Sequence, residues 1–550
     1  MNIRHYTISG HIVDALKKEQ YDGTLVIEDG RIKEIIRQAV PEDAPFILPG
    51  FIDSHIHIES TLLIPEKYAG LAVTKGVVAI VSDPHEIANV TGLEGVSFMI
   101  DNGHKVRFHF NFGASPCVPC TPFETAGAVL DAKDMEALLE RDDIYGMAEF
   151  MNAVGVVYKD PVCMAKLEAA RKAGKPVDGH APGLSGNFLK QYAEAGISTD
   201  HECVSIEEGR ERLQLGMYLQ IREGSASGDF ETLSPLLSES EDHLMFCSDD
   251  KYPNELMEGY IDKMVRDSVR KGHPLWNVLN AACVTPVKHY GLKHGLLQPG
   301  DGADFITVDN LQDFNVTGTY IDGAQVFDGS LIKDNFITDP EPTAVWPNKF
   351  AASSISAEDL KVMPSGKELK VITAQDLSLR TGVELVAPCI KDGAVVADPA
   401  ADILKLVVYN RYSESKPQVA FIKGFRLECG AMASTIAHDS HNIVAIGTED
   451  GEIVKVINRL VELKGGIVIS DGTQTKEIAL PIAGLMSPVD GEEMAKKYAE
   501  LKAQAQKQGC PFNAPFMTMA FMALPVIPDI KLTDKGLFDA VAFQFTPLMQ

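Results

Sequence analysis

The sequence predicts an α/β fold, a (β/α)8 TIM-like barrel with a small flanking β domain and a C-terminal, mostly β domain. Eight short apolar runs recur between residues 51 and 252, and most are separated by stretches with helical periodicity. Eight such units over about 240 residues match the size of a (β/α)8 barrel. The runs are "FIDSHIHIES", "VVAIVSDPHE", "RFHFNFGASP", "IYGMAEFMN", "KPVDGHAPG", "ISTDHECVS", "MYLQIREGSA" and "LMFCSDDKY". Polar residues end most of them, on the side where the active sites of such barrels lie.

Short strands and turns lie on both sides of the barrel region. An Asp29-Gly30 hairpin signal sits between two alternating apolar runs near the start, and the same strand-and-turn pattern returns after residue 290. We expect these two segments to pair into one composite domain. The predicted domains are therefore 1–48 with 291–345 (small β domain), 49–290 (barrel), 346–365 (linker) and 366–550 (C-terminal β-rich domain, with a helix at "GEEMAKKYAELKAQAQKQG" and an apolar tail).

The charge balance excludes several classes of partner. Lys and Arg total 50 against 77 for Asp and Glu, a net charge of −27, which would repel nucleic acid and anionic membranes. A neutral or cationic small molecule is the expected partner. The first residues lack the apolar segment of a signal peptide, and the nine scattered cysteines fit reduced thiols, so we expect a cytoplasmic protein. We also expect a homo-oligomer, specifically a dimer.

Candidate metal ligands follow the apolar runs. His55 and His57 occupy alternate positions of one strand, so both imidazoles face the same side and can approach one cation. Further candidates end four later runs. Four imidazoles and two carboxylates suit two divalent ions, Mn or Fe with Zn as the alternative. The predicted ligands are His55, His57, Glu149, His180, His201 and Asp249.

At these residues the chain resembles the amidohydrolase superfamily, and the surrounding stretches resemble its bacterial adenine deaminases. The similar stretches include "LPGFIDSHIHIEST", "SDPHEIANV", "DGHAPGLSG", "TDHE", "REGSAS", "CSDD" and "ASTIAHDSHNIVAIG", and together they span nearly the whole chain. The resemblance implies hydrolysis of adenine, with water, to hypoxanthine and ammonia. It also implies that His55 and His57 hold the first metal, His180 and His201 the second, that Glu149 bridges them, and that Asp249 binds metal and moves protons. Many superfamily members bridge their metals with a carbamylated lysine, and here a glutamate of the same charge replaces it.

Other polar residues near the run ends are candidates for contacts with the substrate. Asp83 and His85 could bind the purine or another metal, against a structural salt-bridge role. Glu59 and Ser60 directly follow the histidine pair and could also contact the substrate. Glu223 is the candidate for an assisting protonated acid. In the C-terminal region, "AHDSHN" places His438, Asp439 and His441 together, either over the barrel mouth or in a plain turn.

Three alternatives stay open. A cyclic-amide hydrolase of the same superfamily, such as a dihydroorotase or hydantoinase relative, would use the same ligands. A metal-binding scaffold without turnover is the non-enzymatic alternative. The third is the zinc nucleobase deaminase pattern of H-x-E followed by P-C-x-x-C, which His57, Glu59, Cys117 and Cys120 match. That pattern would leave His180, His201 and Asp249 without a role.

Overall fold

The structure is a computed structural model that describes residues 5–341 and 345–550, and its centre is a parallel β-barrel. Each of the eight predicted runs contains one strand, which confirms the predicted fold class. Two parallel sheets, one of five and one of three strands, make up the barrel wall. Ser198 N donates to Val177 O between β9 and β10, and Asp249 N donates to His55 O where the wall closes. The strands are β5 (Phe51–Ile56), β6 (Val77–Ser82), β7 (His109–Ala114), β8 (Ile144–Phe150), β9 (Val177–Gly179), β10 (Thr199–Asp200), β11 (Tyr218–Arg222) and β12 (Leu244–Cys247).

Helices surround the barrel, and local sequence signals set their ends. The helix α6, for example, begins after Asp160, whose side chain accepts hydrogen bonds from Val162 N and Cys163 N. It ends at Gly174, whose φ of 65° lies in the left-handed region that glycine adopts without strain. The helices are α1 (Pro65–Thr74), α2 (His85–Thr91), α3 (Leu93–Gly103), α4 (Ala132–Leu139), α5 (Ala153–Val157), α6 (Pro161–Ala173), α7 (Gly186–Glu194), α8 (Ile206–Gln214), α9 (Phe230–Leu233), α10 (Pro253–Glu258), α11 (Ile261–Arg270), α12 (Leu275–Leu279) and α13 (Thr285–Tyr290).

A seven-stranded sheet lies beside the barrel and contains strands from both ends of the barrel region. Its order is β15-β14-β13-β4-β1-β2-β3, with β4 and β13 antiparallel at the junction of the two segments. Phe305 pairs with Pro49 there, so the chain leaving β4 passes directly into β5. The strands are β1 (His5–Asp14), β2 (Glu19–Glu28), β3 (Arg31–Arg37), β4 (Phe46–Pro49), β13 (Phe305–Val308), β14 (Val316–Ile321) and β15 (Ala324–Phe327).

The C-terminal region is built on an eight-stranded sheet in the order β17-β16-β21-β20-β23-β22-β24-β25. The predicted helix near residue 500 is present as α15, and α14 is a helix that the sequence analysis did not predict. Ile355 and Leu360, within the predicted linker, are buried against the apolar face of α14. Residues 342–344 of the Pro-rich stretch before it, and residues 1–4 of the first predicted domain, lie outside the described residues. The elements are β16 (Leu369–Thr373), β17 (Gly382–Val386), β18 (Ile390–Lys391), β19 (Ala394–Val395), β20 (Leu404–Tyr409), β21 (Gln418–Lys423), β22 (Ala431–Ser434), β23 (Ile443–Gly447), α14 (Asp450–Leu463), β24 (Gly466–Ser470), β25 (Thr475–Ala479), α15 (Gly491–Lys507), α16 (Pro515–Ala520), β26 (Ile530–Thr533), β27 (Gly536–Asp539) and β28 (Gln544–Phe545).

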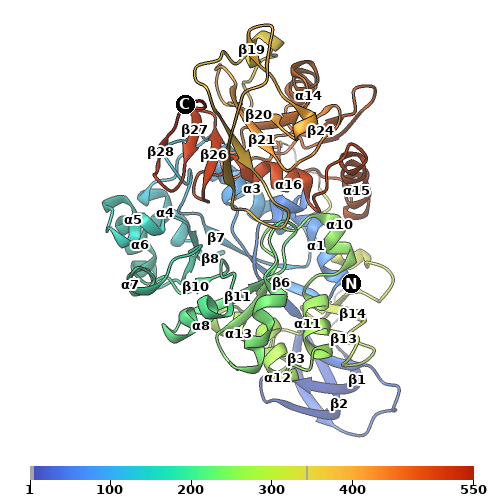
Figure 1. Cartoon of the computed structure of the whole chain (residues 1–550). Coiled ribbons are helices and arrows are strands. Elements are labelled where there is room, and N and C mark those ends of the chain that lie inside the picture. Colours follow the sequence, from blue (N-terminus) through green and yellow to red (C-terminus); the bar gives the residue numbers. More distant parts are fainter. Residues whose placement is uncertain (1–4, 342–344) are drawn as a thin grey trace.

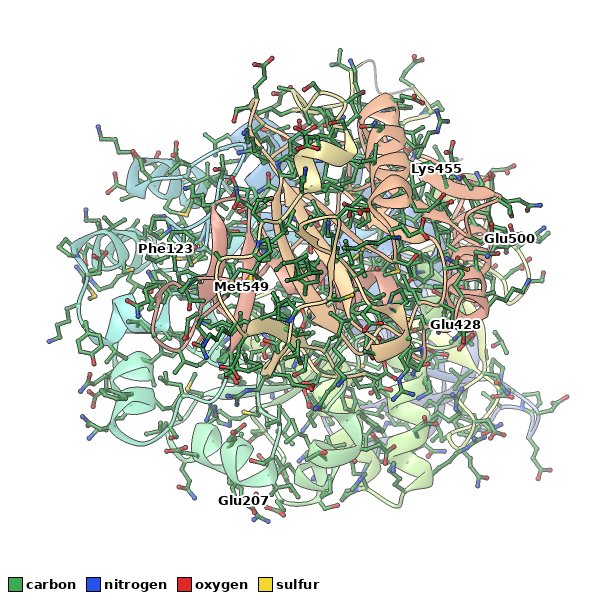
Figure 2. All side chains as sticks on the ribbon, turned by 45° about the horizontal axis from the view of Figure 1, so that its top comes forward. Phe123, Glu207, Glu428, Lys455, Glu500 and Met549 are labelled. Carbon is green, nitrogen blue, oxygen red and sulfur yellow. The ribbon has the colours of Figure 1, made fainter. Side chains whose placement is uncertain are left out.

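Figure 1 shows the C-terminal region (orange to red) at one end of the barrel and the strands β1 to β3 at the other. One continuous apolar core joins the barrel and the C-terminal region, since Leu63 and Ile482 belong to the same buried cluster. Ser487 N also donates to Leu62 O, at 2.9 Å. Charged side chains such as Glu207, Glu428 and Glu500 are exposed on the outside (Figure 2). In the described part of the chain, every helix is too short or too polar to cross a bilayer.

Candidate active site

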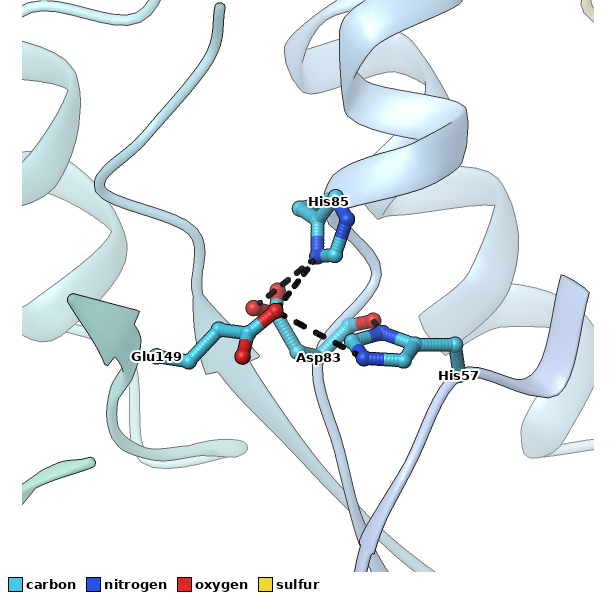
Figure 3. A group of neighbouring side chains, drawn as sticks. All are labelled: His57, Asp83, His85 and Glu149. Carbon is cyan, nitrogen blue, oxygen red and sulfur yellow. Dashed lines mark hydrogen bonds and ion pairs between the residues drawn. The ribbon is translucent and has the colours of Figure 1, made fainter. Parts of the chain in front are cut away.

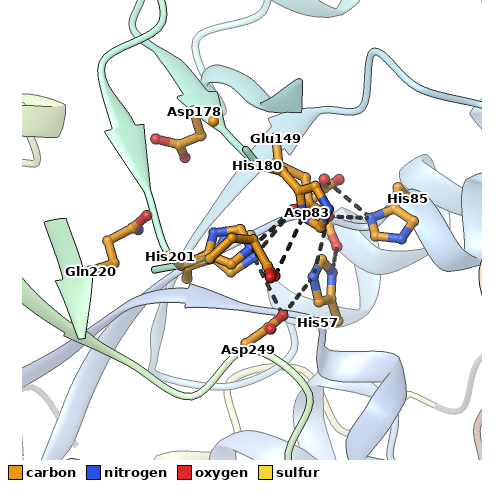
Figure 4. Close-up of polar contacts among 12 residues, drawn as sticks. His57, Asp83, His85, Glu149, Asp178, His180, His201, Gln220 and Asp249 are labelled. Carbon is orange, nitrogen blue, oxygen red and sulfur yellow. Dashed lines mark hydrogen bonds and ion pairs between the residues drawn. The ribbon is translucent and has the colours of Figure 1, made fainter. Parts of the chain in front are cut away.

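All six predicted metal ligands meet at the carboxyl ends of the barrel strands. His55 lies in β5 and His57 one residue beyond it, Glu149 lies in β8, and the other three follow β9, β10 and β12. Because parallel strands end on the same side of a barrel, residues almost 200 positions apart become neighbours. All six side chains are buried. Figure 4 shows polar contacts that link His57, His180 and His201 with Glu149 and Asp249.

The carboxylate of Glu149 lies at the centre of this group. Its Oε1 is 3.6 Å from His57 Nε2, while its Oε2 is 3.1 Å from His180 Nδ1 and 3.3 Å from His201 Nε2. His55 Nε2 lies 3.9 Å from Oε2. Burial raises the pKa of Glu149, but the surrounding imidazoles outweigh this and hold the pKa well below its ordinary value. A carboxylate whose two oxygens both face imidazoles from different strands has the arrangement of a bridging ligand.

Asp249 faces the first histidine pair with one oxygen and an arginine with the other. Its Oδ1 is 3.2 Å from His57 Nε2 and 3.6 Å from His55 Nε2. Arg222 Nη1 donates to its Oδ2 at 2.8 Å. Burial raises the pKa of Asp249, and the two histidines and Arg222 together shift it well below its ordinary value. Its backbone φ of 56° is strained for a residue other than glycine, a feature that concentrates at functional sites.

The imidazoles are prepared for cations by their surroundings. His57 Nδ1 lies 3.1 Å from the Asp83 carbonyl, so Nδ1 carries the proton and the lone pair of Nε2 points at the two carboxylates. The buried nitrogens His55 Nε2, His180 Nε2 and His201 Nδ1 have no hydrogen-bond partner among the described residues. Buried polar atoms are normally paired. Three imidazole–carboxylate groups here have atoms close enough to share an ion, and the donor set fits borderline divalent metals.

His85 adds a further imidazole to this group, beside Asp83. Its Nδ1 is 3.2 Å from Asp83 Oδ2 and 3.4 Å from Glu149 Oε1 (Figure 3). Asp83 also accepts a hydrogen bond from Ser115 Oγ. A small cavity lies next to the candidate metal ligands. Among the described residues, His85 lines this cavity and Asp83 does not.

The other predicted substrate residues lie outside the cavity wall. Glu59 Oε1 accepts from Ile87 N at 3.1 Å, which ties it to the start of α2. Ser60 Oγ donates to Asp250 Oδ1. Both side chains are buried behind the cavity, where they support residues that do line it.

The structure does not bring Glu223 to the site. Its Oε1 lies 3.7 Å from Lys263 Nζ, and its side chain is 30% exposed. Alternate residues of a strand face opposite sides, and β11 ends with Arg222 facing inward. The residue that reaches the site from this strand is therefore Arg222.

Sequence reasoning missed four kinds of site residue. Glu202 lies 3.5 Å from His201 Nε2 and bonds Arg222, and Asp250 lines the cavity. Both directly follow predicted ligands, in "TDHE" and "CSDD", so adjacency was an available signal. Arg222 could have been found from the alternation of side chains along its strand, which places Arg222 and not Glu223 on the inner side. One apolar lining residue, Met151, directly follows β8. The other apolar lining residues come from the C-terminal region, and no local pattern marks them: Leu379, Phe521, Leu524 and Ile527.

The fold and the site together define a barrel of the hydrolase class with a buried candidate metal centre. Comparisons with known proteins agree: residues 46–326 match the Amidohydrolase family, and residues 378–544 match the Adenine deaminase C-terminal domain. The chain belongs to the adenine deaminase family of amidohydrolases. It is 49% identical to the adenine deaminase of Salinibacter ruber over 545 residues and 47% identical to that of Methanosarcina mazei over 552 residues. Each comparison covers 98% of both chains.

Proposed function

We propose that this protein hydrolyses the exocyclic amine of adenine, giving hypoxanthine and ammonia. The observation that carries the proposal is the convergence of four imidazoles and two carboxylates on one buried point, in a chain of this family. The C-terminal match favours a purine substrate over the cyclic amides that other barrels of this superfamily hydrolyse. A homodimer is the assembly we expect, and analytical ultracentrifugation would check it.

Two divalent ions, Mn or Fe, would complete the site. His55, His57 and Asp249 would hold one, His180 and His201 the other, with Glu149 shared between them. When bound, such ions lower the pKa of water so that a nucleophile forms at neutral pH. The unpaired Nε2 of His55, which faces both Glu149 and Asp249, supports this assignment.

Asp249 is the residue placed to move protons. Water attacks C6 of adenine, so one of its protons must leave, and the C6–N bond breaks only after the amine has gained a proton. Asp249 is ionised, because its pKa is held well below neutrality, and it can accept the first proton and deliver it to the amine. Arg222 fixes one of its oxygens and leaves the other facing the centre.

The test is a deamination assay joined to metal analysis. Protein loaded with Mn should hold at least two ions per chain, remove the ultraviolet band of adenine and release ammonia. Dihydroorotate and hydantoin serve as competing substrates. Turnover of these two without adenine turnover would show the cyclic-amide activity instead, and full activity with one ion per chain would end the binuclear proposal.

Glu149→Ala tests the bridging role. Without the shared carboxylate, two cations about 3.5–4 Å apart would repel each other, so we expect loss of at least one ion per chain together with activity. Glu136→Ala, at an exposed position of α4, is the matched control. Normal metal content in Glu149→Ala would assign the bridge to another residue.

A further inference from the structure

The loop between β22 and β23 brings a second group of buried polar side chains to the barrel mouth. His85 Nε2 lies 3.7 Å from Asp439 Oδ1, and His438 Nδ1 lies 3.4 Å from Glu86 Oε1. His441 Nε2 lies 4.0 Å from Glu86 Oε2. These three residues of the loop are at most 3% exposed. The segment "AHDSHN" therefore lies over the mouth, where it faces α2 of the barrel.

The ring of His438 is held in one orientation. It stacks on Phe521 with ring centroids 4.2 Å apart and planes 16° apart. Its Nδ1 faces the Glu86 carboxylate, which favours the tautomer with the proton on Nδ1 and a free lone pair on Nε2. That Nε2 is buried and has no hydrogen-bond partner among the described residues. An acceptor held in this way is prepared for a donor that the protein itself does not supply.

Beside His438, the C-terminal region supplies one acid, Asp439, and several apolar side chains to the wall of the cavity. His438 and Phe521 line the cavity with Leu379, Leu524 and Ile527, and five of the six metal-ligand candidates line the same cavity. The cavity volume is about 20 Å³, which is room for about one water molecule. A purine therefore needs side chains that line the cavity to move apart, and once bound it would contact the lining residues, His438 included.

We propose that His438 is a substrate-contacting residue whose Nε2 accepts the imidazole-ring N–H of a free purine base. The proposal rests on the proposed function and deepens it. Adenine carries one N–H on its five-membered ring. In a nucleoside or a 9-alkylated base, a carbon substituent replaces the hydrogen of this group. His438 would thus pair with a group that only the free base offers.

The same side chains do not suit a third metal ion. Glu86, His438 and His441 have the composition of a cation site. However, Ala437 N donates to His441 Nδ1 at 3.3 Å, so the proton of this imidazole lies on Nε2, the nitrogen that faces Glu86. A protonated nitrogen cannot ligate a cation.

Two variants of the metal-loaded full-length protein separate a hydrogen bond from packing. His438→Phe keeps a ring against Phe521 and removes both nitrogens, whereas His438→Gln restores an acceptor. We expect His438→Phe to raise KM for adenine at least about tenfold, with kcat changing less than about threefold and metal content unchanged. His438→Gln should recover part of the loss. His273→Gln, at a half-buried surface position bonded to Ser238, is the control.

Ligand analogues give a reading that does not depend on turnover. Hypoxanthine also carries the ring N–H, so calorimetry should show that it binds His438→Phe at least about tenfold more weakly than the natural protein. The control ligand 9-methylhypoxanthine lacks this N–H and should bind both proteins equally weakly. If the natural protein does not turn over adenine but its hypoxanthine binding still depends on His438, the proposed function is wrong and the role of His438 in binding stands. Unchanged hypoxanthine binding in both variants, or a third ion per chain that His438→Phe loses, would overturn the role of His438.

Discussion

Asp249 and Arg222 show how single side chains are prepared for chemistry in this protein. The carboxylate of Asp249 keeps one oxygen on Arg222 and turns the other to His55 and His57. The strained φ of Asp249 is tolerated because backbone contacts on both sides fix it, including the hydrogen bond from its N–H to His55 O. Such a residue can lose its function without disturbing the fold.

Asp249→Asn should slow turnover while leaving the site assembled. Asparagine keeps the size and one ligating oxygen and tolerates the same left-handed conformation, but it cannot accept a proton. Positioned acid–base catalysis is worth about 10² to 10⁴ in rate, so we expect kcat to fall at least about a hundredfold with both metals retained. Kinetics beside metal analysis checks this, with exposed Asp242→Asn as control. A near-normal kcat with both ions present would remove Asp249 from the mechanism.

Glu124 is a buried acid outside the metal centre, and it predicts a pH-dependent stability. Burial raises its pKa to about 8, and Asp439 and Asp534 add to the shift. Between 4.5, the ordinary glutamate value, and about 8, the folded protein keeps a proton that the unfolded chain has released. Stability is therefore lost as pH rises through this window.

Glu124→Gln should remove that loss. The amide oxygen can still accept the hydrogen bond from Cys120 Sγ, and glutamine cannot ionise. We expect the variant to match the natural protein near pH 5 and to exceed its stability by on the order of 2–4 kcal/mol at pH 8 to 9. Thermal melts across this range give the comparison. A difference in Tm that does not change with pH would show that Glu124 ionises normally.

At the scale of elements, the loop after β7 distinguishes the barrel metal site from the alternative zinc deaminase pattern. It carries Cys117 and Cys120, which the alternative zinc pattern would use as ligands. Burial raises the pKa of Cys117 to about 11 and that of Cys120 well above its ordinary value, and Cys120 donates to Glu124 at 2.8 Å. Both thiols are buried, and Cys120 already uses its proton in the hydrogen bond to Glu124, which favours packing as their role.

Cys120→Ser should therefore keep the metal content and most of the activity. The hydroxyl can donate to Glu124 in place of the thiol, and we expect a loss in kcat/KM of less than about fivefold. Metal analysis and kinetics on the variant are sufficient. Loss of metal and activity together would restore the alternative pattern.

At the scale of the whole molecule, the barrel and the C-terminal region behave as one body. Their apolar residues form one continuous buried cluster. Polar contacts cross the boundary as well: Thr125 N donates to Asp534 Oδ1, and Asn442 Nδ2 donates to Thr125 O. The mouth of the barrel is closed by this packing, so the site depends on both parts.

We accordingly expect the protein to unfold in a single thermal transition and a chain ending at residue 345 to be insoluble. Removal of the C-terminal region would expose a large apolar surface around the barrel mouth, which promotes aggregation. Calorimetry of the full chain and expression of the shortened chain test this. Two separate transitions, or a soluble shortened chain that melts at the temperature of the full chain, would show independent domains.

The sequence by itself determined the barrel and the six residues at its centre. Parallel strands are buried continuous apolar runs, and their ends must meet, so His55 and Asp249 could be placed together without coordinates. Side-chain direction beyond a strand end was not determined in this way, and Glu223 was chosen where Arg222 reaches the site. Only the tertiary structure decided the contacts of Glu86 with His438 and of His438 with Phe521. The first contact joins the barrel to the C-terminal region, and the second joins two distant segments within the C-terminal region. Packing of that kind leaves no periodic signal in either segment.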